Sequence, residues 1–347
     1  MTNSEIIFNL RQLVKSGSCE NIKLKDVLYC HNCTYLIQKM SQSFQDKLEL
    51  ILSSISVKER YAHGKPLFDA LHDYPYAVIK GAVLSNQIYG SPFIRRSGDL
   101  DILIRRQELD YAKQVLLDCG FIQGRVVNDE IVPFTRRELI FQTSQSHQVA
   151  PFVKETGNKF CPFINFDLNT SIFWGEYGHT CDMNLVLSQT QETGLCDVSF
   201  KKLSSEMEFI SLCLHHYKDM NSIYLLATGS IKLSLFCDIF DYLKNVPVDT
   251  DKLYDLSTQL NANPYIYYCL WYTKQVFDTE FLDQFISKYE SPEGISLLST
   301  FGLSNDEKHK WSIDFFDRLF STSFRTDFQA SLSEKEKKKI KLNQMLM

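Results

Sequence analysis

Long apolar runs and an excess of positive charge are both missing from this chain of 347 residues. No segment approaches the roughly 18 uninterrupted apolar residues of a membrane-spanning helix, so we do not expect the chain to act in a membrane. The formal net charge is −5, whereas a general nucleic-acid-binding domain is usually basic. These absences argue against a membrane protein and against broad nucleic-acid binding, although a local basic site stays compatible with them.

A regular cysteine framework is also missing, because the ten cysteines are scattered along the chain. The first residues, MTNSEIIFNLRQLVK, have the pattern of an amphipathic helix and not the long apolar core of a signal peptide. We therefore expect reduced thiols in a cytoplasmic protein. Cys30-His31-Asn32-Cys33 is a C-x-x-C motif, but it lies in a helical stretch without a second copy, which argues against a zinc or redox site.

Apolar periodicity divides the chain into three ranges and predicts an α+β fold. Residues 1–73 and 201–347 repeat apolar residues at three- and four-residue spacing, which is typical of helices. Residues 74–200 contain short β-like runs, among them ELIFQTS (138–144) and FINFDLNTSIFW (163–174). We predict a small mixed sheet at 74–200, flanked by an N-terminal helical region and a C-terminal helical domain.

Two aspartates stand at the head of an apolar strand in RRSGDLDILI, residues 95–104. Because side chains alternate along a strand, Asp99 and Asp101 point to the same side, and Leu100 and Ile102 point to the other. Two like charges this close repel each other unless a cation lies between them. Mg²⁺ is suited to this role, since it binds carboxylates, water and phosphates. The alternative is an exposed strand end with two solvated aspartates.

The segment IKGAVL, residues 79–84, favours phosphate binding near these aspartates. A junction of strand, glycine and helix presents free backbone N–H groups at the positive end of the helix dipole. Gly81 permits close backbone approach, and Lys80 adds a positive charge. Arg95 and Arg96 add planar donors that match phosphate oxygens. We therefore expect a phosphate site beside the carboxylate pair.

These residues resemble the bacterial "uncharacterised nucleotidyltransferase" family of the polymerase-beta-like nucleotidyltransferase superfamily. The family pattern is Lys-Gly, a helix that ends near a tyrosine, and R-x-S-x-D-[IL]-D before an apolar strand. This chain matches the pattern at Lys80, Gly81, Tyr89, Arg95, Ser97, Asp99, Leu100 and Asp101. Toxin nucleotidyltransferases of abortive-infection systems have a similar string. The resemblance implies that 74–200 is a nucleotidyltransferase palm domain.

The same resemblance implies roles for individual residues. Asp99 and Asp101 would be catalytic and hold metal, and Lys80, Gly81, Arg95 and Ser97 would bind the nucleotide. One position departs from the superfamily, which often has Gly-Ser or Gly-Gly at this junction, and where a serine hydroxyl would bind the terminal phosphates. This chain has Ala82 there, and Ser85 is a potential replacement one turn later.

A third carboxylate is expected on a later strand, and Asp167 in FINFDLNTSIFW is the best candidate. It shares one strand face with Asn165 and Asn169, and the other face is apolar. The family often reads D-L-H-W here, so Asn169 replaces a histidine. We predict that Asp167 is a catalytic residue and the third metal ligand. The alternatives are a structural aspartate at the sheet edge, or Asp182 or Asp197 as the third acid.

The C-terminal half contains a second set of candidates. His215 and His216 are adjacent on a predicted helix and therefore point in different directions, and without an HEXXH motif we expect packed histidines and no zinc site. The family tends to continue with a helix that carries R/K-L…D-I, which this chain matches at Lys232 and Asp238. The resemblance implies that these two residues bind nucleotide, and an ion pair between helices is the alternative.

Together these patterns predict a metal-dependent nucleotidyltransferase that moves a nucleoside monophosphate from an NTP to a hydroxyl and releases pyrophosphate. Two Mg²⁺ ions are the expected cofactor, with Mn²⁺ as an alternative. The expected partners are an NTP and a hydroxyl-bearing acceptor, which would be a small molecule, a peptide or tRNA. The sequence leaves the acceptor, the base and the oligomeric state open.

Two other functions stay open at this point. One is a toxin-like nucleotidyltransferase that acts on tRNA or protein, although the acidic pI of about 5.9 argues mildly against tRNA. The other is a catalytically degenerate module that binds a nucleotide or a partner. Ala82 and Asn169 support this second reading, whereas the intact pair Asp99 and Asp101 opposes it.

Overall fold

The computed structural model divides the chain into two units that are described separately below. The sheet unit is Ser43–Glu208, and the helical unit combines Met1–Gln42 with Phe209–Met347. The structure describes the whole chain except residues 18–20, 41–42, 146, 175–180, 230, 305–307, 322–323 and 347. In the part described, no helix is both long enough and apolar enough to cross a membrane.

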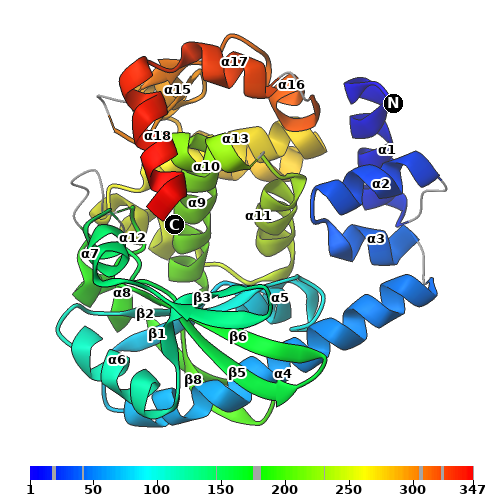
Figure 1. The fold of residues 1–347 in the computed structure, drawn as a ribbon. Coiled ribbons are helices and arrows are strands. Elements are labelled where there is room, and N and C mark those ends of the chain that lie inside the picture. Colours follow the sequence, from blue (N-terminus) through cyan, green and yellow to red (C-terminus); the bar gives the residue numbers. More distant parts are fainter. Residues whose placement is uncertain are drawn as a thin grey trace. The chain divides into compact units, whose positions relative to one another are not determined.

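An eight-stranded mixed sheet forms the centre of the sheet unit (Figure 1). Its order is β4-β3-β5-β6-β2-β1-β8-β7. The pairs β2–β6 and β1–β8 are parallel, and the other neighbours are antiparallel. The strands are β1 Tyr76–Ile79, β2 Asp99–Ile104, β3 Ile122–Val127, β4 Glu130–Pro133, β5 Phe152–Asn158, β6 Cys161–Asn169, β7 Thr190–Leu195 and β8 Val198–Leu203. A mixed sheet with helices confirms the predicted α+β class.

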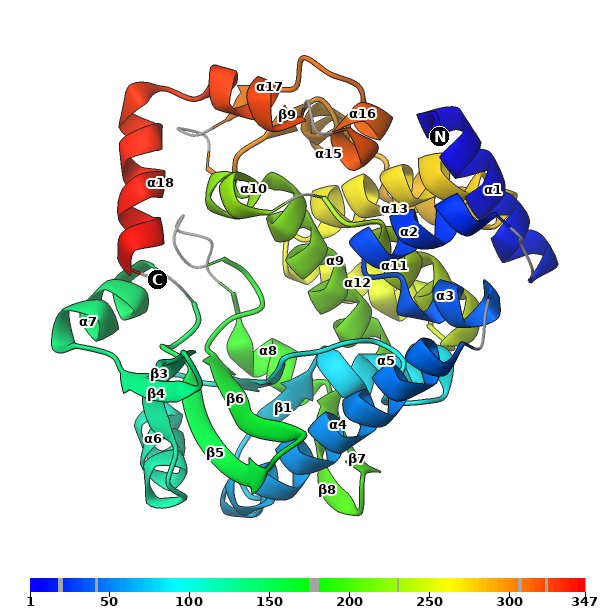
Figure 2. The ribbon, with the colours of Figure 1, turned by 45° about the vertical axis from the view of Figure 1, so that its right-hand side comes forward.

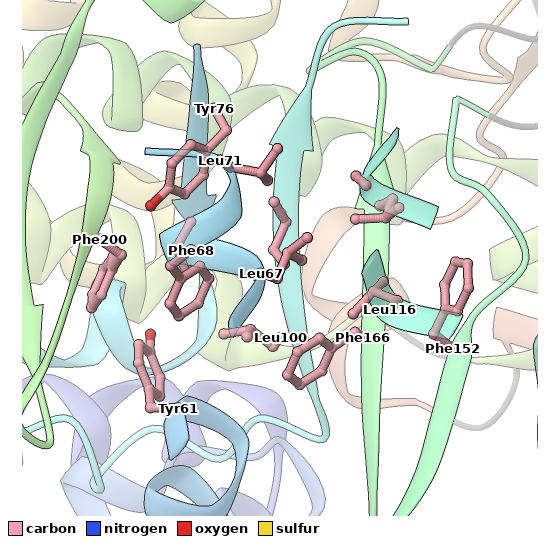
Figure 3. Close-up of a cluster of buried hydrophobic side chains, with 14 of the residues drawn as sticks. Tyr61, Leu67, Phe68, Leu71, Tyr76, Leu100, Leu116, Phe152, Phe166 and Phe200 are labelled. Atoms are coloured by element: carbon pink, nitrogen blue, oxygen red, sulfur yellow. The ribbon is translucent and has the colours of Figure 1, made fainter. Parts of the chain in front are cut away.

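Helix α4 (Phe44–Ala70) packs along one face of this sheet, where it contacts β6 and β8 (Figure 2). It begins with a capping box, in which Ser43 and Asp46 bond each other's backbone N–H groups. Its apolar side inserts Tyr61 and Phe68 into a buried cluster with Leu100 and Phe200 of the sheet (Figure 3). This face of β2 is thus the apolar one, and the aspartates of β2 lie on the opposite face.

The expected ranges 1–73, 74–200 and 201–347 do not coincide with the two compact units. Helix α4 groups with the sheet, whereas residues 1–42 group with the C-terminal helices. Arg11 on α1 (Asn3–Ser16) shows the second grouping, because it donates to the backbone oxygens of Gln275 (2.8 Å) and Val276 (2.9 Å). An apolar stripe defines which face of a helix is buried, but it does not define the element that covers the face.

The expected strand ELIFQTS is wrong, because this segment lies in helix α7 (Arg136–Gln145). Thr135 and Glu138 form the reciprocal bonds of a helix start: Glu138 accepts from the Thr135 backbone at 2.7 Å, and the Thr135 hydroxyl accepts from the Glu138 backbone at 3.3 Å. This T-x-x-E spacing is the sequence signature of a helix N-terminus, and it overrides the β-like residues that follow. The other helices of the sheet unit are α5 Gly81–Tyr89, α6 Leu109–Asp118 and α8 Met183–Ser188.

Helix α13 (Asn263–Phe277) is the central element of the helical unit, where it contacts α1, α11, α12, α14 and α15. Aromatic side chains fill this centre, as in the cluster of Tyr217, Tyr265 and Tyr268. The remaining elements are α2 Ile22–Cys30, α3 Thr34–Met40, α9 Ser205–Asn221, α10 Ile223–Thr228, α11 Leu233–Asn245, α12 Thr250–Gln259, α14 Asp283–Tyr289, α15 Pro292–Leu297, β9 Thr300–Phe301, β10 His309–Lys310, α16 Phe315–Phe320, α17 Phe324–Ser331 and α18 Glu334–Leu346, with a 3₁₀ turn at Glu280–Leu282. Helix α9 begins in the sheet unit and continues into the helical unit.

Candidate active site

The register between β2 and β6 brings three aspartates to one face of the sheet. Asp101 lies opposite Asp167, and Asp99 lies opposite Asn165. Residues that are paired across neighbouring strands point to the same face, and so do residues two apart on one strand. Asp99, Asp101 and Asp167 therefore share a face, which is the grouping that the sequence predicted.

Burial leaves this group of carboxylates poorly compensated. Asp101 is only 7% exposed and Asp167 only 9%. Burial, and then the charges of Asp101 and Asp99, raise the pKa of Asp167 to about 7, while Lys80 and a hydrogen bond from Gln148 act in the opposite direction. Burial and Asp101 also raise the pKa of Asp99. The site therefore favours a cation that would neutralise its negative charge.

Lys80 lies at the junction between β1 and α5 and adopts an unusual backbone conformation. Its φ of 59° and ψ of −150° lie in a region that is rarely open to residues with a Cβ. Its ammonium group is 3.2 Å from Asp101 Oδ1, so it compensates part of the carboxylate charge. A lysine side chain has no acceptor and cannot cap the first N–H groups of α5. The positive end of α5 thus starts beside the aspartates.

The other residues that the sequence suggested for phosphate binding lie in α5 and in the loop before β2, and their contacts differ. Ser85 donates to Ser91 O at 2.7 Å and accepts from the Arg95 N–H at 3.0 Å, so its hydroxyl holds the loop and does not replace the serine missing at position 82. Arg96 pairs with Glu49 of α4 at 3.0 Å. Arg95 is half-buried, and Ser97 lies next to Gly81.

Asn169, which departs from the family's histidine, contacts the central aspartate directly. Its Nδ2 donates to Asp101 Oδ1 at 3.0 Å and to the backbone oxygen of Asp167 at 3.3 Å. Asn169 is fully buried. It therefore helps to fix the Asp101 carboxylate on the shared face, a role that the sequence analysis did not assign to it.

Arg60 on α4 is the main residue of the site that the sequence analysis missed. Its guanidinium group donates to Ser97 Oγ at 3.0 Å, and it interacts electrostatically with Asp99. The sequence contains a signal for it, because Arg60 lies beside Tyr61 on the apolar side of α4 that includes Val57 and Phe68. An arginine within such a stripe is buried only where a polar partner accepts its hydrogen bonds.

The donor set fits magnesium. Oδ1 of Asp167 and Oδ1 of Asn165 are buried and have no hydrogen-bond partner among the described residues. Within the same described ranges, no group of three or more His, Cys, Asp or Glu side chains is arranged to hold a metal ion by itself. Mg²⁺ rarely uses an all-protein cage, since it takes one or two carboxylates and completes its shell with water and substrate phosphates. The aspartates provide oxygens of this kind.

The other candidates for the third carboxylate have structural positions. Asp182 caps helix α8, where it accepts from the Asn184 and Leu185 N–H groups. Asp197 lies exposed in the turn between β7 and β8 with a φ of 62°. Asp167 is thus the one of the three that lies opposite Asp101.

The remaining predicted residues belong to the helical unit. Lys232 donates to the backbone oxygen of Cys30 at 2.9 Å. Asp238 is buried, and its Oδ2 is 3.5 Å from Nε2 of His216, which is fully buried, as expected for a packed histidine. His215 is 3.4 Å from Asp219 on the same helix. The assignment of Lys232 and Asp238 to nucleotide binding stays a prediction.

A helix start with free N–H groups beside a carboxylate-rich sheet face offers donors to an anion and oxygens to a hard cation. The chain belongs to the family of uncharacterised nucleotidyltransferases, whose model matches residues 27–278. The match covers the whole sheet unit and extends through α13, so the chain is a transferase of nucleotidyl groups. Neither the curated proteins nor the solved structures contain a match to this chain.

Proposed function

We propose that the chain is a metal-dependent nucleotidyltransferase, which transfers a nucleoside monophosphate from an NTP to a hydroxyl and releases pyrophosphate. The acceptor hydroxyl lies on a small molecule, a peptide or a tRNA. The observation that carries the proposal is the register of β2 and β6, which puts Asp99, Asp101 and Asp167 on one sheet face. The buried and unpaired Oδ1 of Asp167 supports it, because such an oxygen is costly unless a ligand satisfies it.

Each residue has a role in this reaction. Bound Mg²⁺, as two ions, would neutralise the triphosphate and the charge that develops on the leaving pyrophosphate. Asp99 and Asp101 offer oxygens to it, and Asn169 orients the Asp101 carboxylate. Asp167 would offer oxygens to the same ions and would take the proton of the acceptor hydroxyl, whose oxygen attacks the α-phosphorus as the bond to pyrophosphate breaks.

The phosphates would lie at the start of α5. The N–H groups of α5 provide donors, and Gly81, which has no Cβ, leaves room for a phosphate oxygen. Lys80 now pairs with Asp101. When metal and nucleotide bind, its ammonium group would transfer this interaction to a phosphate oxygen, since both partners are anionic. Arg95 and Ser97, in the loop before β2, would offer further donors to these phosphates.

Calorimetric titration with non-hydrolysable NTP analogues tests the proposal. We expect binding that requires Mg²⁺, and we expect the double variant Asp99→Asn/Asp101→Asn to weaken it by more than about tenfold, because both lost charges hold the metal. The matched control is Asp197→Asn, which makes the same change in an exposed turn and should leave binding unchanged.

The result that contradicts the proposal is a wild-type protein that binds none of the NTP analogues with or without Mg²⁺. In that case the fold would serve as a degenerate module that binds a partner. Equal binding by the wild-type protein and the double variant would also count against it, because the nucleotide would then occupy a site away from the aspartates.

A further inference from the structure

Arg60 is a buried cation with an unusual set of partners. Only 3% of the residue is exposed. Its two terminal nitrogens donate to serine hydroxyls, Nη1 to Ser56 Oγ and Nη2 to Ser97 Oγ, both at 3.0 Å. Among the described residues, no carboxylate oxygen lies within ion-pair distance of its guanidinium group, although the charge of Asp99 favours the protonated form. A fully buried cation with neutral partners is costly, so a structural role alone explains it poorly.

The bond to Arg60 determines how the Ser97 hydroxyl can be used. An arginine has donors and no acceptor, so Ser97 Oγ must accept this hydrogen bond. The hydroxyl proton of Ser97 must therefore point to a different group. Within the part of the chain that the structure describes, this proton has no protein acceptor. Ser97 consequently keeps its hydroxyl proton available to donate to a ligand.

The Ser97 hydroxyl lies at the junction of β1 and α5. A Cβ placed on Gly81 would be 3.4 Å from Ser97 Oγ and 3.5 Å from Ser97 Cβ. Ser97 Oγ thus lies beside the position that a side chain on Gly81, the first residue of α5, would occupy. The residue after Gly81 is Ala82, which has no hydroxyl, so it cannot donate a side-chain hydrogen bond here.

We propose that Arg60 is a positioning residue for phosphate binding, which holds the Ser97 hydroxyl so that Ser97 donates to a phosphate at the start of α5. This inference rests on the proposed function, because it needs a phosphate at the start of α5. The proposal also gives α4 a role in the site. This helix packs on the opposite, apolar face of the sheet, and its residue Arg60 reaches Ser97. The pair Arg60–Ser97 also joins residues that are 37 apart in sequence.

A double-mutant cycle tests the inference, with magnesium tripolyphosphate as the ligand so that no choice of base is needed. Calorimetry would measure its affinity for the wild-type protein, Arg60→Met, Ser97→Ala and the combined variant. We expect each single change to weaken binding roughly tenfold, as for the loss of one charge-assisted hydrogen bond. We expect the combined variant to bind no more weakly than Ser97→Ala, because Arg60 acts through Ser97.

Two further variants separate positioning from folding. Lys65→Met removes a cation from the exposed side of the same helix, where Lys65 pairs with Asp69, and it should leave the affinity unchanged. Arg60→Lys keeps a charged donor and should recover part of the affinity. If Arg60→Met does not give a folded protein by its thermal melting curve, the cycle of Arg60→Lys with Ser97→Ala measures the same coupling.

Unchanged affinity in Arg60→Met, or effects of Arg60 and Ser97 that add independently, would overturn the inference and leave the proposed function in place. A wild-type protein that binds neither tripolyphosphate nor an NTP analogue would overturn both. The two failures are distinguishable. If only the inference fails, the wild-type protein still binds the ligand in a magnesium-dependent way, and the double variant Asp99→Asn/Asp101→Asn loses this binding.

Discussion

The local environment of Asp167 in the sheet unit opposes its negative charge. This aspartate is buried, its Oδ1 has no partner among the described residues, and two carboxylates lie nearby on the same face. Its folded pKa of about 7 lies above the ordinary value of 3.8. The stability contribution of such a group is complete below about pH 3.8 and is lost as the pH rises to about 7. At pH 8 the metal-free protein therefore bears the full cost of this charge.

Asp167→Asn should raise the free energy of unfolding of the metal-free protein by roughly 1–3 kcal/mol at pH 8, because it removes a buried charge. The gain should shrink towards pH 4, where the wild-type side chain is protonated in the folded state and partly protonated in the unfolded state. Urea unfolding in the presence of a chelator at pH 4 and pH 8 measures this. A variant less stable than the wild-type protein at pH 8 would contradict the argument, and Asp197→Asn, in its exposed turn, is the control.

The same residue scale shows what the sequence could predict and what it could not. The two-residue period of a strand was enough to predict that Asp99 and Asp101 share a face. The strand pattern also favoured Asp167 over Asp182 and Asp197, but its place opposite Asp101 comes from the register of β2 and β6, which arises from tertiary pairing. Arg60 could not be assigned to the site, because its partner Ser97 lies on a distant loop that only the packing of α4 brings close.

At the scale of elements, the β1–α5 junction stores conformational strain at the place where phosphates are expected. A residue with a Cβ at the φ and ψ of Lys80 costs about 1–3 kcal/mol relative to glycine. Such strain persists where the surrounding structure holds it, here through the pairing of β1 with β2 and β8. The strand–glycine–helix pattern predicted this junction, but the unusual backbone at Lys80 has no counterpart in the sequence pattern.

Lys80→Gly should therefore be more stable than Lys80→Ala by at least about 1 kcal/mol, because both variants lose the ion pair with Asp101 and only glycine relieves the backbone. Both should lose most of the nucleotide affinity. Denaturant unfolding of the two variants gives the difference. The opposite sign is expected two residues later, where Ala82→Gly weakens a regular helical position. Equal stability of the two Lys80 variants would show that the junction is not strained.

At the scale of the whole molecule, the residues of the sheet unit lie in the sequence between the two segments of the helical unit. Each unit contains a buried titratable group, and burial lowers the pKa of the group in one unit and raises the pKa of the group in the other. In the helical unit, burial and then the charge of Lys232 lower the pKa of His31 to about 4, and its Nδ1 accepts the Leu233 N–H at the start of α11. In the sheet unit, burial raises the pKa of Glu208 to about 7, opposed by Lys202 and Gln87.

These two groups predict opposite responses to acid. His31 has a folded pKa below its ordinary value of 6.5, so its contribution is present above pH 6.5 and is lost as the pH falls to about 4. Glu208 has a folded pKa above its ordinary value of 4.5, so its contribution is lost as the pH rises from 4.5 to about 7. Acidification from pH 8 to pH 5 should thus weaken the helical unit by roughly 2 kcal/mol through His31 and strengthen the sheet unit by a similar amount through Glu208.

Calorimetric melting curves at pH 8 and pH 5 check this with one variant in each unit. His31→Asn keeps an acceptor for α11 without titrating, so it should reduce the loss of stability of the helical unit at pH 5. Glu208→Gln removes the buried charge, so it should raise the melting temperature at pH 8 by several degrees and at pH 5 by much less. If the two units melt separately, each variant shifts a different melting transition. If the units melt together, both variants shift the same transition. If His31→Asn lost as much stability between pH 8 and pH 5 as the wild-type protein, the role of His31 would be refuted. The variant has no titratable group at position 31, so it should not show the loss that comes from this residue.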